Sequence, residues 1–586
     1  MTASREAPVT LRSSRWFAPK DLFGFLHRTA LRSAGLSDVA IAGRPVIGIA
    51  NSHSELVNCN LHFDKLVAAV KRGVQAAGGL ALEFPTISLS EMLTKPTTML
   101  YRNLMSMDIE EMIRSSPLDA VVLVGGCDKT VPAQLMGAAS AGVPAIALTG
   151  GPMQPGNFRG RRIGAGTDIW RYTDDLRAGR MSAGEYAELE AATRPGVGHC
   201  SEMGTASTMA TLTEALGMSL PGSAAVPATD ARRGALAEET GRRAVEIANE
   251  ELRPADILTL EALENAVTTL AAVAGSTNAV LHLIALAGRL GVDLPLDRFD
   301  RIAARTPVLT NIQPAGEHLF EDLQRAGGVT ALLGELAPLL HLDTLTVTGR
   351  TMGDNIAGTE VWDRDVLRPL DAPLQPAGGL AVLRGSLAPD GAVIKVSAAT
   401  EGLLRHRGPA LVFEGVDDLL GRIDDPDLPV VADTVLVLRG AGPKGAPGMP
   451  EWGMLPIPRK LLAQGVTDMV RISDARMSGT GYGTVVLHAA PESAVGGPLG
   501  AVNDGDEILL DVSARRLDLC VASHEISRRL ARRPLPDPAY RRGYGSIYLD
   551  HVLQADAGAD FDVLRHRPGE EETEPRGLLE GWISGW

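Results

Sequence analysis

The chain has 586 residues, of which 45% are hydrophobic and 22% charged, so we expect two or more domains with their own cores. A formal net charge of −15 argues against nucleic acid as a partner, because phosphate binding needs clustered Lys and Arg. The sequence has no apolar run of about 18 residues, and residues 1–20 lack an apolar signal core, so we expect no membrane contact and a cytoplasmic location.

The first part of the chain alternates apolar runs with helical patterns. Buried strands are expected at residues 44–50 (RPVIGIA), 119–124 (DAVVLV) and 144–148 (PAIAL). Helices are expected near residues 61–77, from about 132, and at 205–217, 232–251 and 261–290. This alternation predicts a doubly wound, mainly parallel sheet, in which chemistry collects at loops beyond the carboxyl ends of the strands.

The pattern changes after residues 371–379 (DAPLQPAGG), which read as a linker. Short β-type runs broken by Gly, Pro and Asp then cover residues 380–384, 393–397, 410–414, 434–439, 469–472, 484–488 and 507–512. The predicted fold class is therefore α/β, with an N-terminal α/β domain at residues 1–375. A second, β-rich domain, barrel-like or sandwich-like, is expected at residues 376–586.

Four cysteines are too few for a disulfide scaffold in a chain of this length. Cys59, Cys127 and Cys200 lie in polar, glycine-rich settings at predicted element ends, whereas Cys520 is expected to be a buried strand residue. The spacings of 68 and 73 residues match no compact zinc or ferredoxin pattern, so three unrelated core thiols are an alternative to three converging ligands. The Gly-Gly-Cys-Asp-Lys context of Cys127 is poorly explained by packing alone.

Two further groups of residues have the chemistry of a site. Glu91 and Asp128 are candidate Mg²⁺ ligands, although an isolated acid is more often a surface charge and Lys129 could simply pair with Asp128. Residues 471–483 (RISDARMSGTGYG) form either a flexible turn or a loop that presents the hydroxyls of Ser478 and Thr480 to a ligand. A serine acts as a base only where its pKa is lowered, for example by a nearby cation.

Four longer blocks carry a family resemblance: residues 125–132 (GGCDKTVP), 198–207 (GHCSEMGTAS), 274–283 (AGSTNAVLHL) and 469–488 (MVRISDARMSGTGYGTVVLH). From about residue 15 to 564 the sequence resembles the dihydroxy-acid and sugar-acid dehydratases. Residues 89–103, 107–112 and 544–564 resemble the sugar-acid branch of arabinonate and xylonate dehydratases more than the branch of amino-acid biosynthesis.

The resemblance implies removal of water from a 2,3-dihydroxy carboxylate, a sugar acid, to give a 2-keto-3-deoxy acid. It implies an iron–sulfur cluster with one open iron, [2Fe-2S] or with four irons, in the N-terminal domain, and Mg²⁺ beside it. The catalytic serine would come from the C-terminal domain, and the assembly would be a homodimer or homotetramer. The implied residues are Cys59, Cys127 and Cys200 for the cluster, Glu91, Asp128, carbamylated Lys129 and Glu451 for Mg²⁺, Ser478 as base, and Thr480 as a hydroxyl beside the substrate.

The sequence departs from the sugar-acid pattern at His53 and Asn58, where that pattern has Trp and Pro, and around Trp452. We expect these positions to influence which substrate is preferred. Three alternatives stay open: a dihydroxy-acid dehydratase of branched-chain biosynthesis, a magnesium enzyme with structural thiols, and an iron–sulfur redox-sensing regulator. The charge of −15 and the absence of a DNA-binding motif disfavour the regulator.

Overall fold

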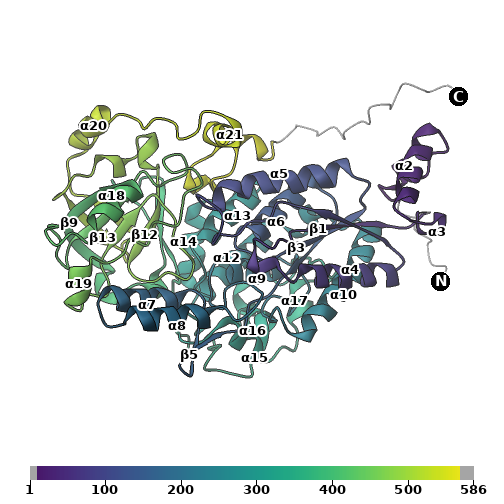
Figure 1. The fold of residues 1–586 in the computed structure, drawn as a ribbon, viewed down its shortest axis with the longest axis horizontal. Helices are drawn as coiled ribbons and strands as arrows, with labels where there is room; N and C mark the ends of the chain where they lie inside the picture. Colours follow the sequence, from purple (N-terminus) through teal and green to yellow (C-terminus); the bar gives the residue numbers. More distant parts are fainter. Residues whose placement is uncertain (1–9, 42, 568–586) are drawn as a thin grey trace.

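The computed structural model describes residues 10–41 and 43–567. It has an α/β part built on a four-stranded sheet and a barrel built on an eight-stranded sheet (Figure 1). Part of the N-terminal segment expected to lack a signal core, residues 1–9, lies outside the described residues. No described helix has the combination of length and apolar composition that crossing a bilayer needs.

The four-stranded sheet has the order β2-β1-β3-β4, and all neighbours are parallel. The strands are β1 (Val46–Asn51), β2 (Leu80–Pro85), β3 (Ala120–Gly125) and β4 (Ala145–Thr149). Every residue of β1, β3 and β4 is buried, as their continuous apolar runs predict. The expected parallel sheet is confirmed. Edge strand β2 was not predicted, because it is only partly buried and its sequence is mixed.

Helices cover both faces of this sheet (Figure 1). α4 (Phe63–Ala76) and α10 (Ala231–Glu250) pack on one face, and α5 (Met99–Ser115) and α6 (Thr130–Ala141) on the other. α4 and α10 approach closely at two glycines. A Cβ on Gly73 would lie 1.8 Å from the carbonyl oxygen of Glu238, and one on Gly241 would lie 2.2 Å from that of Val70. The absence of side chains at both positions therefore sets the distance between the helices.

The remaining elements of the α/β part surround this core. Three N-terminal helices are α1 (Ser14–Phe17), α2 (Leu22–Ser33) and α3 (Asp38–Ile41). A hairpin of β5 (Gly156–Phe158) and β6 (Arg161–Ile163) leads into α7 (Thr167–Arg177) and α8 (Ala183–Thr193). The others are α9 (Thr205–Ala215), α11 (Pro254–Ile257), α12 (Leu260–Ala272), α13 (Asn278–Arg289), α14 (Leu296–Arg305), α15 (Phe320–Arg325), α16 (Gly328–Glu335) and α17 (Met352–Ile356).

The eight-stranded sheet has the order β14-β13-β9-β10-β11-β12-β8-β7. Its strands are β7 (Ala381–Leu383), β8 (Gly391–Ile394), β9 (Arg405–Glu414), β10 (Val435–Arg439), β11 (Arg471–Ser473), β12 (Val485–Ala490), β13 (Glu507–Asp511) and β14 (Arg516–Leu519). The two edge strands meet just beyond β7, where Arg384 O accepts a hydrogen bond of 2.9 Å from Leu517 N and Arg384 bridges to Arg516. The sheet therefore nearly closes, which confirms the expected β-rich, barrel-like region and not the sandwich.

Each of the seven β-type runs expected in this region overlaps a strand, β7 to β13. The prediction for Cys520 was wrong: β14 ends at Leu519, and Cys520 is exposed. Three helices accompany the barrel, α18 (Gly415–Arg422), α19 (Arg459–Ala463) and α20 (Ser523–Arg532). The chain then returns to the α/β part, where α21 (Gly543–His551) lies beside α5 and Tyr544 Oη donates to Leu100 O at 2.8 Å (Figure 1).

Candidate active site

One pocket lies between the carboxyl end of the parallel sheet and the loops of the barrel. Its cavity volume is about 70 Å³. The residues that line it are Asn58, Cys59, Ser90, Glu91, Met92, Cys127, Asp128, Arg194, His199, Cys200, Gly204, Thr205, Ala206, Glu451, Ser478 and Thr480. All of the site residues expected from the sequence are in this set except Lys129, which lies buried behind it.

The three thiols reach the pocket from three different connections. Cys59 lies on a short 3-10 turn after β1, Cys127 follows β3 directly, and Cys200 precedes α9. Because β1 and β3 are neighbours in a parallel sheet, their carboxyl ends place the first two thiols side by side. All three are free cysteines.

The surroundings of Cys127 and Cys200 favour their neutral form. A contact with Cys59, together with burial, raises the pKa of Cys127 well above its usual range. Burial, with Glu202 adding to it, raises the pKa of Cys200 to about 12, although Arg194 opposes this. Thiolates here would therefore need a positive charge next to them, and a group of converging sulfur donors is the set that suits iron–sulfur clusters.

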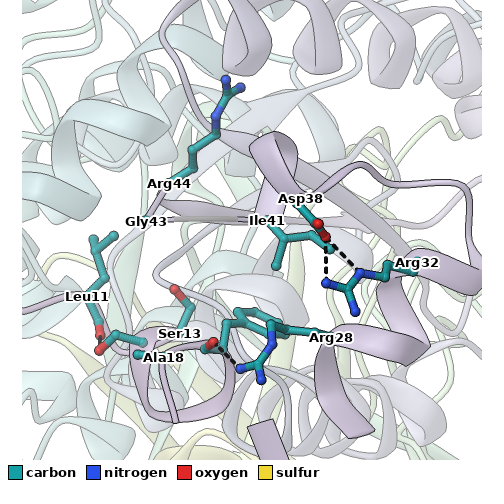
Figure 2. A pocket seen from close by; sticks show the side chains of 11 residues that line it. Leu11, Ser13, Ala18, Arg28, Arg32, Asp38, Ile41, Gly43 and Arg44 are labelled. Carbon is teal, nitrogen blue, oxygen red and sulfur yellow. Dashed lines mark hydrogen bonds and ion pairs between the residues drawn. The ribbon is translucent and has the colours of Figure 1, made fainter. Parts of the chain in front are cut away.

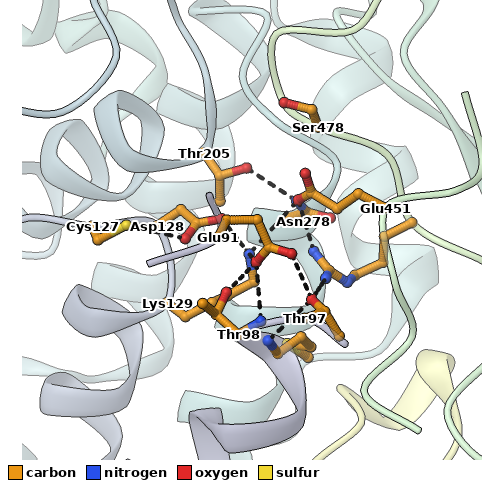
Figure 3. Close-up of polar contacts among 12 residues, drawn as sticks. Glu91, Thr97, Thr98, Cys127, Asp128, Lys129, Thr205, Asn278, Glu451 and Ser478 are labelled. Atoms are coloured by element: carbon orange, nitrogen blue, oxygen red, sulfur yellow. Dashed lines mark hydrogen bonds and ion pairs between the residues drawn. The ribbon is translucent and has the colours of Figure 1, made fainter. Parts of the chain in front are cut away.

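Beside the thiols, three carboxylates converge (Figure 3). Glu91, Asp128 and Glu451 each offer an oxygen within 4.8 Å of the others. Glu91 is held by Thr97 Oγ1, which donates to Oε1 at 2.7 Å, and by the backbone N–H and hydroxyl of Thr98. Oxygen donors in such a cluster suit a divalent cation such as Mg²⁺.

Lys129 lies at the centre of this acidic group, with its side chain fully buried. Its Nζ donates to Asp128 Oδ2 and lies 3.7 Å from Glu451 Oε1 and 3.9 Å from Glu91 Oε2. Burial raises the pKa of Asp128, but Lys129 lowers it by more, so the net shift is downward. Burial raises the pKa of Glu451, and the opposing charge of Lys129 does not cancel this because Glu91 adds to the rise.

Two residues that were not predicted from the sequence link Glu451, from the barrel region, to residues of the α/β part. Arg476 Nη1 donates to Glu451 Oε1 at 3.0 Å, and its Nη2 donates to Thr97 Oγ1 at 3.0 Å. Asn278 Nδ2 lies 3.0 Å from both Glu451 Oε1 and Thr205 Oγ1. Both residues lie inside the family-like blocks of the sequence, but their position there gave no hint of what they contact.

The Ser478 loop approaches from the barrel side (Figure 3). Ser478 Oγ lies 2.9 Å from Thr480 Oγ1, which also accepts a hydrogen bond of 3.1 Å from Trp170 Nε1. Between them, a Cβ on Gly479 would lie 2.5 Å from Thr205 N and 2.8 Å from Ser276 Cβ. Only a glycine lets this loop pack against the start of α9.

A second pocket lies among α1, α2 and α3 (Figure 2). Two of its three arginines are already engaged: Arg28 Nη1 donates to Phe17 O at 2.7 Å, and Arg32 forms a 2.7 Å ion pair with Asp38. This pocket brings together no group of thiols or carboxylates among its lining residues. We therefore place the chemistry in the pocket between sheet and barrel.

Comparison with known proteins identifies the family of the chain. The model of the dihydroxy-acid/6-phosphogluconate dehydratase N-terminal region matches residues 44–355, and that of the C-terminal region matches residues 365–559. L-arabonate dehydratase of Azospirillum brasilense is 50% identical over 570 residues, 96% of this chain and 98% of that protein. The 6-deoxy-6-sulfo-D-gluconate dehydratase of Pseudomonas putida is 48% identical over 568 residues, with the same coverage. A dihydroxy-acid dehydratase of Ignicoccus hospitalis is 44% identical over 545 residues, 92% of this chain and 97% of that protein.

Proposed function

The chain belongs to the dihydroxy-acid/6-phosphogluconate dehydratase family, and from this we propose a hydro-lyase that dehydrates a sugar acid, an aldonate such as L-arabinonate or D-xylonate, to a 2-keto-3-deoxy acid. The observation that carries the proposal is the convergence of three thiols, three carboxylates and Ser478 on one pocket. The two arabinonate dehydratases and the sulfogluconate dehydratase are 48% to 50% identical to this chain, the dihydroxy-acid dehydratase of Ignicoccus hospitalis is 44% identical, and a D-xylonate dehydratase is 40% identical. The first three relatives favour a sugar acid over 2,3-dihydroxyisovalerate.

We propose that Cys59, Cys127 and Cys200 hold an iron–sulfur cluster, [2Fe-2S] or with four irons, and that Glu91, Asp128 and Glu451 hold Mg²⁺. The donors fit both groups, because buried thiols with raised pKa values gain from adjacent iron charge and clustered carboxylates gain from a divalent cation. The chemistry that these groups supply when bound is Lewis acidity, which makes the C2 proton more acidic and helps the 3-hydroxyl to leave.

We also propose that Lys129 is carbamylated in the active protein. As an ammonium it would repel a divalent cation from the carboxylates that it now contacts. Reaction with CO₂ forms an N–C bond, releases a proton and turns the side chain into an anionic oxygen donor. Protein grown with isotope-labelled bicarbonate should show a carbamate carbon signal that is absent in Lys129→Arg.

Residues of the chain itself carry out the proton transfers and bind the substrate. Ser478, as an alkoxide, takes the proton from C2; the electron pair forms the C2–C3 double bond, and hydroxide leaves from C3. That hydroxide takes the proton from Ser478, which releases water and restores the alkoxide, and the enol becomes the 2-keto acid. Arg194 is the one Lys or Arg side chain that lines the described pocket, and its charge suits an anionic substrate.

The first test is the substrate specificity of the purified protein and of Ser478→Ala. We expect dehydration of aldonates in preference to 2,3-dihydroxyisovalerate, and a loss of kcat in Ser478→Ala of at least about a hundredfold at an unchanged cluster spectrum. Near-normal turnover of this variant would exclude Ser478 as the base, and a preference for 2,3-dihydroxyisovalerate would favour the branched-chain reaction. Iron content tests the cluster: Cys127→Ser should lose iron, and Cys520→Ser, an exposed thiol, should keep it.

We further propose that the protein forms a homodimer or homotetramer and has no nucleic-acid or membrane partner. Sedimentation of the purified protein, which gives its mass in solution, tests the oligomeric state.

A further inference from the structure

Lys395 is a buried cation that the reaction outlined above does not use. It follows β8 directly, and its side chain is among the largest that are fully enclosed. No carboxylate of the described chain lies within ion-pair distance of its Nζ, and burial alone lowers its pKa to about 7. Its hydrogen-bond partner is the carbonyl oxygen of Gly479, at 3.4 Å. An enclosed lysine without a carboxylate partner is costly, so a specific role is expected at this position.

The peptide that Lys395 contacts leads directly to Ser478. The carbonyl of Gly479 and the N–H of Thr480 belong to the same peptide group, and this N–H donates to Ser478 Oγ at 3.4 Å. A cation at the carbonyl end of an amide polarises the group and strengthens its N–H as a donor at the other end. The charge that Lys395 carries below its pKa of about 7 therefore acts on the serine oxygen through one peptide bond.

A second donor reaches the same oxygen with support from Trp170 on α7. The indole N–H can only donate, so Thr480 Oγ1 accepts from it at 3.1 Å. The Thr480 hydroxyl proton is then free to point at Ser478 Oγ, 2.9 Å away. Ser478 Oγ thus faces two donors from Thr480, the backbone N–H and the side-chain O–H. Lys395 contacts the peptide group that carries the N–H, and Trp170 donates to the oxygen that carries the O–H.

We propose that Lys395 and Trp170 are positioning residues that stabilise the alkoxide of Ser478, Lys395 through the Gly479–Thr480 peptide and Trp170 through the Thr480 hydroxyl. This inference rests on the proposed role of Ser478 as base. Preorganised donors aimed at a developing oxyanion are worth far more in an enclosed site than in water, and Lys395 has no competing acid to neutralise it. The other charged groups that line the pocket with Ser478 are Glu91, Asp128, Glu451 and Arg194.

The variants separate the charge of Lys395 from its packing. Lys395→Gln keeps a neutral donor for Gly479 O, and Lys395→Met removes donor and charge together. Trp170→Phe keeps an aromatic ring but removes the indole N–H and part of the ring system. Lys460→Met is the matched lysine control, because Lys460 Nζ donates to the carbonyl oxygen of Pro426 at 3.1 Å, outside the residues that line the pocket. Trp362→Phe, at a side chain that is 71% exposed, is the control for tryptophan.

Two readouts apply to each variant at an unchanged cluster spectrum. The first is the pH profile of kcat, whose acidic limb reports ionisation of Ser478. We expect this limb to move to higher pH by about one unit in Lys395→Gln and Trp170→Phe, which is about a tenfold loss of kcat below the limb. The second is the rate at which phenylmethanesulfonyl fluoride labels Ser478, measured by mass spectrometry; the serine oxygen displaces fluoride from sulfur, and this rate should fall in the same variants.

The two controls should match the unmodified protein in both readouts. If Lys395→Gln and Trp170→Phe are folded and neither the limb nor the labelling rate moves, the proposal is overturned; this outcome holds even where Lys395→Met fails to fold. The labelling rate needs no substrate. Failure of the proposed function, seen as an unmodified protein that dehydrates no sugar acid, is thus distinguishable from failure of this inference.

Discussion

At the scale of single residues, the cysteines differ in how far their convergence follows from the sequence. Cys59 and Cys127 come after two strands that the sequence identifies, and a parallel sheet brings such positions to one edge. Cys200 follows no strand of this sheet; the packing of α9 brings it to the pocket. Spacing along the chain could not have placed it, and only the family resemblance assigned it to the same site.

The three positions that depart from the sugar-acid pattern, His53, Asn58 and Trp452, lie in different parts of the structure. His53 lies outside the pocket, with Nδ1 3.5 Å from Asp64 Oδ1, and Trp452 packs on an apolar cluster of the barrel. Asn58 alone lines the pocket, and its Nδ2 is enclosed without a hydrogen-bond partner in the described part of the chain. Asn58 is therefore the departure with a donor available for a substrate hydroxyl.

Asn58→Ala should change substrate preference more than it changes the chemistry. Substrates whose hydroxyl pairs with Nδ2 should lose about tenfold in kcat/KM, because a site loses discrimination when a specific hydrogen bond is removed. The measurement is kcat/KM over a panel of aldonates, with iron content as a check because Cys59 Sγ lies 3.9 Å from Asn58 Oδ1. Asn249→Ala, on the far helix α10, is the control. An equal loss for every substrate would contradict a role in selection.

At the scale of elements, periodicity located the buried strands and the helices α4, α6, α9, α10, α12 and α13, but it missed the 17-residue helix α5 and the edges of the strands. The apolar runs matched β1, β3 and β4, whose residues are all enclosed. β9 begins at Arg405, before the expected run at 410–414, because its first residues (RHRGP) pair with β13 and are mostly exposed. Polar edge segments carry no alternation of buried residues, so the pattern cannot mark where they begin.

The close approach of α4 and α10 gives a prediction at this scale. Gly241→Ala would place a methyl group 2.2 Å from Val70 O, a backbone atom that cannot move alone, so we expect destabilisation by about 1–3 kcal/mol. Gly234→Ala, on the same helix with nothing within 4 Å of its Cβ, should be stabilising by about 0.5–1 kcal/mol, because alanine is the better helix former. Thermal unfolding of the two variants checks this, and equal melting temperatures would show that the glycine contact does not set the packing.

At the scale of the whole molecule, the site exists only where the two parts of the chain meet. Glu91, Asp128 and the three cysteines of the pocket come from the α/β part, and Glu451 and Ser478 come from the barrel region. We propose that the parts are domains that divide near residue 375. The sequence predicted both architectures, but it could not predict how they dock. Docking depends on side chains such as Arg476 and Asn278, whose partners Thr97 and Glu451 lie 379 and 173 residues away along the chain.

The segment after the barrel holds the two parts together. Arg289 on α13 pairs with Asp560 through bonds of 2.7 and 3.0 Å, and both side chains are almost completely buried. Arg102 on α5 donates to the carbonyl oxygens of Gly558 and Ala559 at 3.0 and 2.9 Å. The residues that follow α21 are thus anchored on helices of the α/β part, which limits how the barrel can move.

Asp560→Asn should weaken this anchor strongly. It removes the closer of the two carboxylates that pair with the buried guanidinium of Arg289 and leaves only Glu110, at 3.5 Å, at a cost of up to about 3–5 kcal/mol. Asp297→Asn is the matched control, because Asp297 and Arg384 also link the two parts, at 2.7 Å, but are 68% and 43% exposed, and such a pair is worth at most about 1 kcal/mol. We expect Asp560→Asn to melt at a clearly lower temperature than Asp297→Asn and to lose activity on mild heating before the barrel unfolds. Equal melting temperatures would mean that the segment after α21 does not hold the two parts together, and that other contacts between them, such as those of Arg476 and Asn278, maintain the pocket.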